Sequence, residues 1–182
     1  MTNSNLIGRA AKIAVLAHKD QKRKSDDSPY IVHPFMVALK LVKHNFEDKV
    51  IAAALAHDVL EDSGFTEEDL RAELGSEVLD IVKAVSENRK LVWEERKKQY
   101  IITIRFSPEC VKAVSISDKI HNLESMLIAY EQFGPKLWEK FNRGKEQQSW
   151  FINGMLEVFK ETWKHPLVDE YAELVARMDA LQ

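Results

Sequence analysis

Apolar residues recur every three or four positions along most of the chain, which is the spacing of an α-helix. Only six Gly and five Pro occur among 182 residues, which leaves few positions for the tight turns of a β-sheet. No internal repeat, low-complexity tract or linker interrupts the pattern. It therefore predicts one all-α domain, residues 1–182, with helices over approximately 7–20, 34–44, 48–63, 66–75, 76–86, 93–105, 108–132, 136–164 and 166–182.

Capping residues mark several of the expected helix ends. Thr66 and Asp69 have the spacing of a capping box, and Gly75 is expected to end the short helix that follows. Ser107 stands where an N-cap is expected for the long helix 108–132. These signals indicate short connections between successive helices.

The first two helices each carry an apolar face that should be buried. His33 directly precedes Pro34, and steric contact with proline restricts the preceding residue to extended conformations. We therefore expect the second helix to begin at Pro34 or Phe35, after an extended His33. The expected inward positions are Ile7, Ala10, Ala11, Ala14, Val15 and Ala17 in the first helix, and Phe35, Val37, Ala38, Leu41 and Val42 in the second.

The stretch 50–63, VIAAALAHDVLEDS, begins as an apolar helical run and ends in four ionisable residues. On an α-helix His57 is one turn from Glu61, and Asp58 is one turn from Asp62. Burying three carboxylates and an imidazole costs free energy unless a cation or a polar cleft receives them. The stretch is therefore a candidate site, and the alternative is a helix end that water solvates.

Two further polar positions stand among apolar neighbours. One is His33, and the other is Asp118 in the phrase VSISDKIHNLESM, on the same helix face as His121 and Asn122. Two imidazoles and two carboxylates from separate helices suit a divalent ion such as Mn, Fe or Zn, with positions left for water and substrate. This combination favours a metal site over isolated core histidines, with candidate ligands His33, His57, Asp58 and Asp118.

Composition narrows the class of protein. The apolar fraction of 45% and the charged fraction of 30% are typical of a globular chain, and the net charge of −3 argues against nucleic acid as the main partner. Arg9 and Lys12 interrupt the apolar N-terminal stretch, which is unlike a signal peptide, and no run approaches the ~18 apolar residues of a membrane span. The single cysteine, Cys110, fits a reducing cytoplasm. The sequence leaves the oligomeric state open.

Local basic clusters can still serve a small anionic ligand. The densest one precedes Pro29, and each of its lysines could also belong to a solvated loop: Lys19, Lys22, Arg23 and Lys24. We interpret a second basic group as a solvated helix face: Arg96, Lys97 and Lys98. The aromatic residues from Trp138 onward favour a packed core over a platform for a nucleotide base.

The polar phrases together resemble a known family. The set His33, His57-Asp58 and Asp118 is similar to the metal-binding pattern of HD-domain phosphohydrolases. QKRK…PYIVHP, then AALAHDVLEDS, then SDKIHNL, at this order and spacing, resemble the hydrolase domain of RelA/SpoT-type alarmone enzymes, whose small stand-alone members include the metazoan SpoT homologue. The resemblance covers about 6–128, and the helices of 136–182 would complete the bundle. Nothing matches the synthetase or regulatory domains of the long bifunctional enzymes.

The resemblance implies an HD-type helical bundle that binds Mn²⁺. The implied activity is hydrolysis of the 3′-pyrophosphate of guanosine 3′,5′-bis(diphosphate) or its pentaphosphate form, the alarmones of the stringent response, to GDP or GTP and pyrophosphate by a metal-activated water. The family's pattern assigns metal binding to His33, His57, Asp58 and Asp118, catalysis to Glu61 and Asp62, and substrate binding to Arg23, Lys24 and Asn122. It assigns no role to His121.

Two alternative functions keep the helical fold. One is an HD phosphohydrolase that acts on another nucleotide, such as a nucleoside monophosphate or NADPH. The other is a catalytically idle HD domain that senses nucleotides. The basic loop with PYIVHP and the pair Glu61-Asp62 favour the alarmone hydrolase over the first alternative. The intact ligand set and the acidic pair argue against the second.

Overall fold

The computed structural model describes residues 6–23, 27–141 and 143–181. Within these ranges every regular element is helical, and the β-type pairing consists of an isolated bridge between Lys22 and Pro29. The elements are α1 (Leu6–Ala17), α2 (Val32–Lys43), α3 (Asp48–Ala56), α4 (Val59–Asp62), α5 (Glu67–Leu74), α6 (Ser76–Val85), α7 (Trp93–Phe106), α8 (Glu109–Phe133), the 3₁₀ helix η2 (Gly134–Lys140), α9 (Gly144–Thr162) and α10 (Pro166–Asp179). The predicted all-α class is confirmed.

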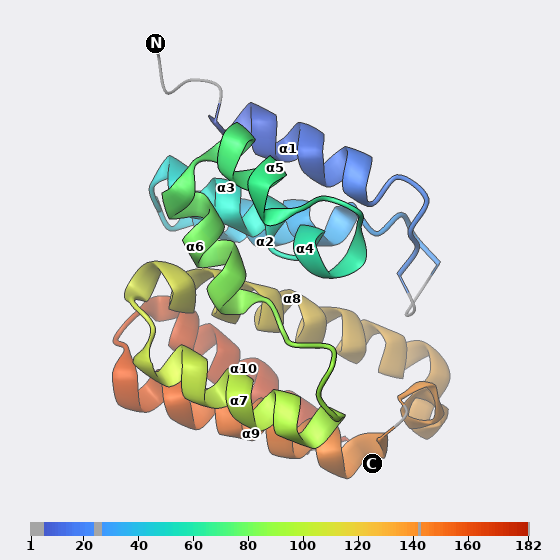
Figure 1. The fold of residues 1–182 in the computed structure, drawn as a ribbon. Helices are drawn as coiled ribbons and strands as arrows, with labels where there is room; N and C mark the ends of the chain where they lie inside the picture. Colours follow the sequence, from blue (N-terminus) through green and yellow to red (C-terminus); the bar gives the residue numbers. More distant parts are fainter. Residues whose placement is uncertain (1–5, 24–26, 142, 182) are drawn as a thin grey trace.

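Helix α8 runs through the middle of the molecule. Figure 1 shows α1 to α6 on one side of it, and α7, α9 and α10 on the other. Its buried residues occupy several faces and include Val114, Ile116 and Leu123. A helix packed from both sides needs apolar residues nearly all round, and this one can therefore carry buried polar side chains between two layers.

Helix α3 is the most fully buried element of the N-terminal half. All seven residues of 50–56 are buried. Four of the seven are alanines, so α1 and α2 can pack close to its backbone, and both contact it. This packing buries α3 up to its end at Ala56.

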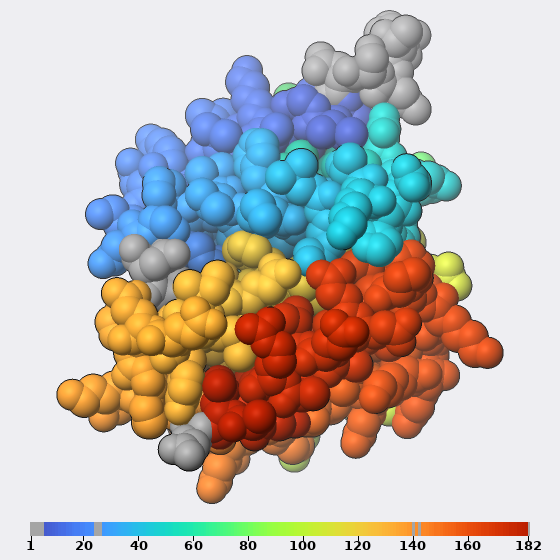
Figure 2. Space-filling model, turned by 180° about the vertical axis from the view of Figure 1, so that it is seen from behind, coloured from blue at the N-terminus to red at the C-terminus, as the bar shows by residue number. Residues whose placement is uncertain are grey.

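The helices on the two sides of α8 meet on the face opposite to the view of Figure 1. Figure 2 shows α2 in light blue, α8 in gold and α10 in red meeting there. Lys40 on α2 donates to Glu124 on α8 at 3.2 Å and also pairs with Glu170 on α10. One largely buried ammonium group therefore links three helices across the junction.

Several predicted helix ends are confirmed. The Thr66 side chain accepts a hydrogen bond from the Asp69 backbone N–H, and the Asp69 carboxylate accepts from the Thr66 N–H, which is a complete capping box. Gly75 and Gly134 have φ of 87° and 56°, a region that glycine enters without steric cost. Both glycines stand directly after a helix.

The helix expected over 48–63 is interrupted. Helix α3 stops at Ala56, and a turn of His57 and Asp58 leads into the short α4. The Asp58 carbonyl still accepts from the N–H of Asp62 at 3.0 Å, so the expected one-turn relation of these two residues is kept. The turn places the His57 and Asp58 side chains beside His33, and His57 also lies near Asp118.

The expectation of an extended His33 was wrong. Its N–H bonds to the Tyr30 carbonyl at 2.9 Å, and His33 lies in the first turn of α2. Pro34 costs no hydrogen bond there, because the first backbone N–H groups of a helix have no partner within the helix. Helix geometry therefore orients the His33 side chain.

Some expected inward positions were also wrong. Val15, Phe35 and Val42 are 47%, 38% and 48% exposed. Both α1 and α2 carry apolar residues on more than one side, so periodicity alone did not identify the side that packs. In α2 the packed side is that of His33, Val37 and Leu41.

Two expected boundaries also differ from the structure. Ser107 does not cap α8, since its hydroxyl donates to the Thr103 carbonyl at 2.8 Å. The segment expected as one helix over 136–164 is divided between η2 and α9. None of the described helices is long and apolar enough to cross a bilayer.

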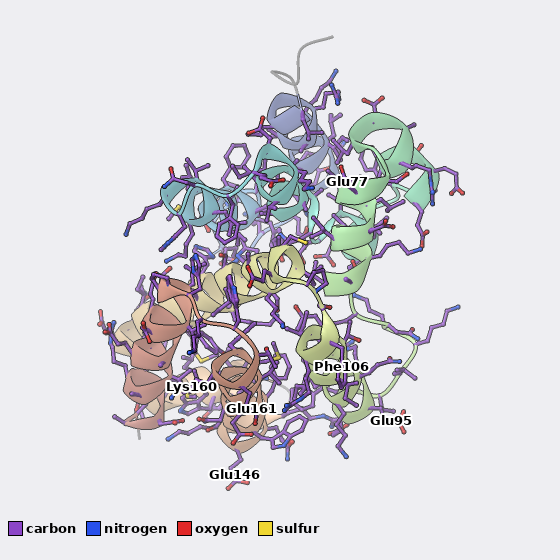
Figure 3. All side chains as sticks on the ribbon, turned by 90° about the vertical axis from the view of Figure 1, so that its left-hand side faces the viewer. Glu77, Glu95, Phe106, Glu146, Lys160 and Glu161 are labelled. Carbon is purple, nitrogen blue, oxygen red and sulfur yellow. The ribbon has the colours of Figure 1, made fainter. Side chains whose placement is uncertain are left out.

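Two phenylalanines with opposite exposure test this core. Phe159 on α9 is fully buried, whereas Phe106 at the end of α7 is 81% exposed (Figure 3). We expect Phe159→Ala to lower the free energy of unfolding by about 3–5 kcal/mol, since it leaves a cavity. Phe106→Ala should change it by no more than about 0.5 kcal/mol. Urea denaturation followed by circular dichroism measures both, and equal losses would contradict the packing described.

Candidate metal centre and active site

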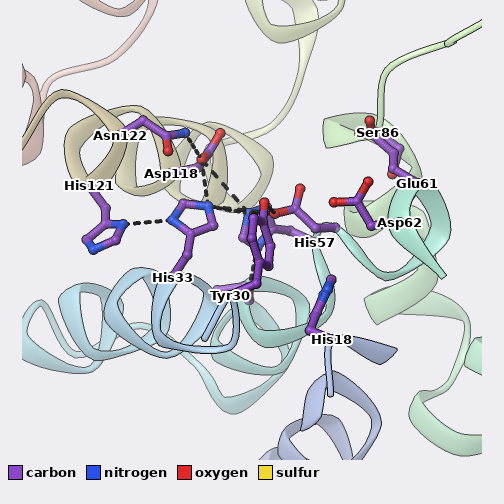
Figure 4. Close-up of polar contacts among 12 residues, drawn as sticks. His18, Tyr30, His33, His57, Glu61, Asp62, Ser86, Asp118, His121 and Asn122 are labelled. Carbon is purple, nitrogen blue, oxygen red and sulfur yellow. Dashed lines mark hydrogen bonds and ion pairs between the residues drawn. The ribbon is translucent and has the colours of Figure 1, made fainter. Parts of the chain in front are cut away.

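Three parts of the chain bring the candidate ligands to one point (Figure 4). His33 comes from the first turn of α2, His57 and Asp58 from the corner between α3 and α4, and Asp118 from the middle of α8. His33, His57 and Asp118 are buried, and Asp58 is partly buried. The predicted convergence of these four residues is therefore present.

The donor atoms of these side chains face one another. The Nε2 atoms of His33 and His57 are 3.2 Å apart, and Asp58 Oδ2 lies 3.1 Å from His57 Nε2. Asp118 Oδ1 lies 3.1 Å from His33 Nε2 and 3.9 Å from His57 Nε2. One donor atom each from His33, His57 and Asp58 falls within 4.8 Å of the others. Ligands about 2.1 Å from a single ion have such separations, so these residues can hold a divalent metal.

Hydrogen bonds on the far side of each ring orient the imidazoles. His57 Nδ1 donates to the Ala54 carbonyl at 2.6 Å, which leaves Nε2 facing the cluster. His33 Nδ1 lies 2.7 Å from Nδ1 of His121. Burial lowers the pKa of His121 to about 4, so that ring is neutral at pH 7 and can accept the His33 Nδ1 proton. Such outer partners fix the tautomer of a metal-binding histidine.

Without a metal ion, the two facing Nε2 atoms of His33 and His57 hold one proton between them. Burial opposes a charge on His57, but the carboxylates of Asp58 and Asp118 outweigh it and raise the pKa of His57 to about 9. Burial lowers the pKa of His33, and the charge on His57 adds to that effect. The 3.2 Å contact between the rings is then a single hydrogen bond.

Both carboxylates have further donors. The Tyr30 hydroxyl donates to Asp58 Oδ2 at 2.6 Å, and burial together with that carboxylate raises the pKa of Tyr30. Lys119 Nζ donates to Asp118 Oδ2 at 2.6 Å, and Asn122 Nδ2 donates to Asp118 Oδ1 at 2.5 Å. Although burial favours the neutral acid, the Lys119 ammonium holds the pKa of Asp118 well below its usual range. Both groups are therefore ionised, as metal ligands must be.

The acidic pair Glu61-Asp62 lies on α4, beside the cluster (Figure 4). Glu61 accepts from the Glu87 N–H at 2.9 Å and from Arg89 Nε at 3.1 Å. Asp62 accepts from Gln21 Nε2 at 2.9 Å and pairs with Arg89 as well. Burial raises the pKa of Glu61, which brings that carboxyl closer to the range of a general base.

Two of the three predicted substrate-binding residues lie together. Arg23 Nη2 is 3.4 Å from Asn122 Oδ1 and 3.1 Å from Ser125 Oγ. The Arg23 guanidinium also lies 5.9 Å from the centre of the Tyr30 ring. Lys24 lies outside the described residues.

A cavity of about 770 Å³ opens beside the donor cluster. Tyr30, Lys119 and Asn122, which bind the cluster's carboxylates, all line it. Among the residues that the structure describes, seven Lys or Arg and three Glu or Asp line the cavity, although the whole chain has a net charge of −3. The basic residues are Lys22, Arg23, Arg89, Arg96, Lys97, Lys119 and Arg143.

The interpretation of 96–98 as a solvated face was wrong for two of its residues. Arg96 and Lys97 line the cavity, and both pair with Glu87, at 2.7 and 2.5 Å. Lys98 is exposed as expected. Helix α7 carries charged residues on more than one side, so the sequence pattern did not show which side faces a cavity.

Sequence reasoning missed several site residues. Tyr30 and Gln21 belong to the phrase around Arg23, and their neighbourhood was the available signal. Lys119 directly follows Asp118. His121 and Arg89 carried no signal for a role, because each acts through a contact with a residue distant in sequence.

In this all-α domain a histidine, a His-Asp pair and a further aspartate meet at one buried point. This combination of fold and site characterises one class of protein. The chain belongs to the HD-domain family, whose model matches residues 10–141. That span contains all four candidate metal ligands.

Several curated relatives are named for one activity, and others are named GTP pyrophosphokinases. Guanosine-3′,5′-bis(diphosphate) 3′-pyrophosphohydrolase MESH1 of Xenopus tropicalis is 32% identical over 156 residues, which cover 82% of each chain. MESH1 of Danio rerio is 35% identical over 132 residues, 69% of this chain and 71% of the relative. The Aquifex aeolicus enzyme named guanosine-3′,5′-bis(diphosphate) 3′-pyrophosphohydrolase is 32% identical over 135 residues, which cover 72% of this chain but only 19% of the relative.

Solved structures support the fold. A Listeria monocytogenes protein superposes with a TM-score of 0.75 at 36% identity, over 80% of this chain and 97% of the other. A metazoan SpoT ortholog, described as hydrolysing ppGpp, superposes with a TM-score of 0.83 over 100% of this chain and 99% of the other. Its 24% identity supports the shared fold only.

The shared proton predicts how metal binding depends on pH. A metal ligand must be deprotonated, and His57 keeps its proton below about pH 9, so the apparent affinity for Mn²⁺ should fall about tenfold per pH unit below that value. Calorimetric titration of the metal-free protein at pH 7 should release about one proton per ion bound.

Two variants control this experiment. His57→Ala removes a donor and should abolish stoichiometric binding, whereas His44→Ala, outside the cluster, should leave it unchanged. An affinity that stays constant between pH 6 and 9 would contradict the proposed proton displacement.

Proposed function

We propose that this protein hydrolyses the 3′-pyrophosphate of guanosine 3′,5′-bis(diphosphate) or its pentaphosphate form, and releases GDP or GTP and pyrophosphate. The observation that carries the proposal is the basic cavity, which opens next to a divalent-metal donor set. A nucleotide with phosphates on both sides of its ribose brings several negative charges, and clustered cations offset them. The names of the curated relatives support the same substrate.

The proposed cofactor is Mn²⁺, held by His33, His57, Asp58 and Asp118. Two imidazole nitrogens with two carboxylates suit an ion of intermediate hardness. When bound, such an ion supplies Lewis-acid activation of water and of a phosphoryl oxygen. Tyr30, His121 and Lys119 hold these ligands in orientation.

Glu61 and Asp62 are the proposed catalytic residues. A water oxygen attacks the phosphorus attached to the ribose 3′ oxygen, and the bond between that phosphorus and the 3′ oxygen breaks. The Glu61 carboxylate takes a proton from the water, since burial has raised its pKa toward the range of a general base. Asp62 orients the water. The proton that Glu61 has taken passes through solvent to the departing 3′ oxygen, which completes the nucleoside hydroxyl and restores the carboxylate.

Arg23, Lys24 and Asn122 are the proposed substrate-binding residues. Asn122 donates to Asp118 and accepts from Arg23, so it joins the metal site to the basic rim of the cavity. Arg23 offers a planar guanidinium suited to a phosphate or to the plane of a base. Lys24 is proposed from its place in the loop alone.

The proposal covers residues 1–182 as a single HD hydrolase domain, with the motif-bearing part at about 6–128 and the helices of 136–182 closing the cavity. Phe141, Arg143 and Phe151 from this C-terminal part line it. The single Cys110 supports a reducing, cytoplasmic location. We expect neither nucleic acid nor a membrane surface as partner.

Substitutions at the metal site and at the acidic pair should separate binding from turnover. Asp58→Ala should lose both Mn²⁺ and activity, because it removes a ligand. Glu61→Gln should keep Mn²⁺ while kcat falls about 10²–10⁴-fold, since it removes the base alone. Metal analysis and pyrophosphate release from guanosine tetraphosphate measure the two effects.

The matched control is Glu68→Gln, on the exposed side of α5, which should match the wild type. The same assay should include a nucleoside monophosphate and NADPH. Faster turnover of either than of guanosine tetraphosphate would replace the proposed substrate. Binding of all nucleotides without turnover of any would make the domain a sensor.

Arg23→Ala should raise KM about tenfold or more with a smaller effect on kcat, because a charge-assisted hydrogen bond to an anion is lost. Lys19→Ala is the control, since Lys19 is exposed and pairs with Asp20. Steady-state kinetics at fixed ionic strength distinguish the two. A similar rise in KM for both variants would indicate a diffuse charge effect and remove Arg23 from the site.

A further inference from the structure

Each carboxylate oxygen of the acidic pair already has a donor from the protein. In Glu61, Oε1 accepts from the Glu87 N–H and Oε2 accepts from Arg89 Nε. In Asp62, Oδ2 accepts from Gln21 Nε2 and Oδ1 accepts from Arg89 Nη2. Two of the four donors therefore come from one guanidinium group.

Arg89 reaches the pair from a different part of the chain. It stands in the connector between α6 and α7, 27 residues after Asp62, and its side chain is 54% exposed. Both carboxylates, in contrast, are only 15% exposed. A solvent-exposed arginine thus extends two rigid donors onto two largely buried acids at the cavity wall.

The geometry of the guanidinium matters here. Its nitrogens lie in one plane with fixed separations, so one Arg can hold two acceptors at a fixed distance and angle, whereas a Lys ammonium cannot. Glu61 and Asp62 are adjacent in sequence and would otherwise repel each other. Asp58, three residues earlier, and Glu87, on the connector, add negative charge nearby. A cation at this position offsets that repulsion and fixes both carboxylates.

We propose that Arg89 is a positioning residue, which holds the carboxylates of Glu61 and Asp62 in the orientation needed for water activation and does not itself bind the substrate. This inference rests on the proposed function for its catalytic consequence. The arrangement of the four donors stands independently of the substrate. Each carboxylate oxygen has a second lone pair, so a water can approach while Arg89 stays in place.

The test compares Arg89→Ala and Arg89→Lys with Lys90→Ala, a substitution of the exposed neighbour in the same connector. Arg89→Ala should lower kcat up to about 10²-fold, the cost of misplacing a catalytic group by about 1 Å. KM for guanosine tetraphosphate should stay within about twofold, and Mn²⁺ content and melting temperature should match the control. Arg89→Lys should recover only part of kcat, because it restores the charge without the planar fork.

A second measurement does not depend on turnover. Arg89 lowers the pKa of Glu61 against the effect of burial, so its removal should raise that pKa. Carbon-13 titration of the glutamate carboxyls should detect the shift, with Glu61→Gln assigning the signal. In active protein, the acidic limb of the kcat profile should move to higher pH by the same amount, because the base must be ionised.

The outcomes are separable. A raised KM with unchanged kcat would make Arg89 a substrate contact and overturn the proposal. Unchanged kinetics in Arg89→Ala would overturn it as well. If Arg89→Ala lowers the melting temperature or the Mn²⁺ content, Arg89→Gln replaces it in the comparison, and an equal loss there makes the role structural and overturns positioning. If wild-type protein does not hydrolyse the alarmone, the proposed function fails while the shift in the Glu61 pKa still tests the contact.

Discussion

The structure depends on burying a charged cluster where α2, the α3–α4 corner and α8 meet. Two imidazole Nε2 atoms lie 3.2 Å apart, with an aspartate beside each, and three of these four residues are buried. Such a cluster is costly unless its charges are balanced and its hydrogen bonds are complete. Lys119, Tyr30 and the Ala54 carbonyl complete them. The contacts that pack these helices together are therefore the same contacts that set the geometry of the site.

A second set of contacts surrounds this cluster. His121 holds the outer nitrogen of His33, and Asn122 joins Asp118 to Arg23. In the acidic pair, Gln21 donates to Asp62 and Arg89 donates to Glu61. Each of these residues comes from a segment other than that of the group it holds, except Asn122. The orientation of the site thus depends on the assembled bundle and not on any one helix.

The two halves of the molecule have different parts in the site. The N-terminal half supplies three of the four candidate ligands and the acidic pair. Basic and aromatic residues of the cavity wall also come from α7, from α9 and from the connection between η2 and α9: Trp93, Arg96, Lys97, Phe141, Arg143 and Phe151. Helix α8 belongs to both, since it carries Asp118 on the metal side and lines the cavity with Asn122 and Ser125. Because the cavity lies between the halves, a change in how they pack would alter substrate binding without touching the metal ligands.

The sequence alone determined the helical class, most helix boundaries and the identity of the residues that meet at the cluster. Apolar periodicity marks helices, and His33, His57-Asp58 and Asp118 are ionisable groups among apolar ones, which is visible without coordinates. Periodicity does not show which side of a helix packs or which segments meet, and the tertiary structure decided both. It turned Phe35 and Val42 outward and His33 inward on the same helix, and it brought Arg96 and Lys97 to a cavity. It also placed Arg89 on two acids 27 and 28 residues away. A local pattern reports the spacing within one helix, whereas a contact between segments exists only after the chain has folded.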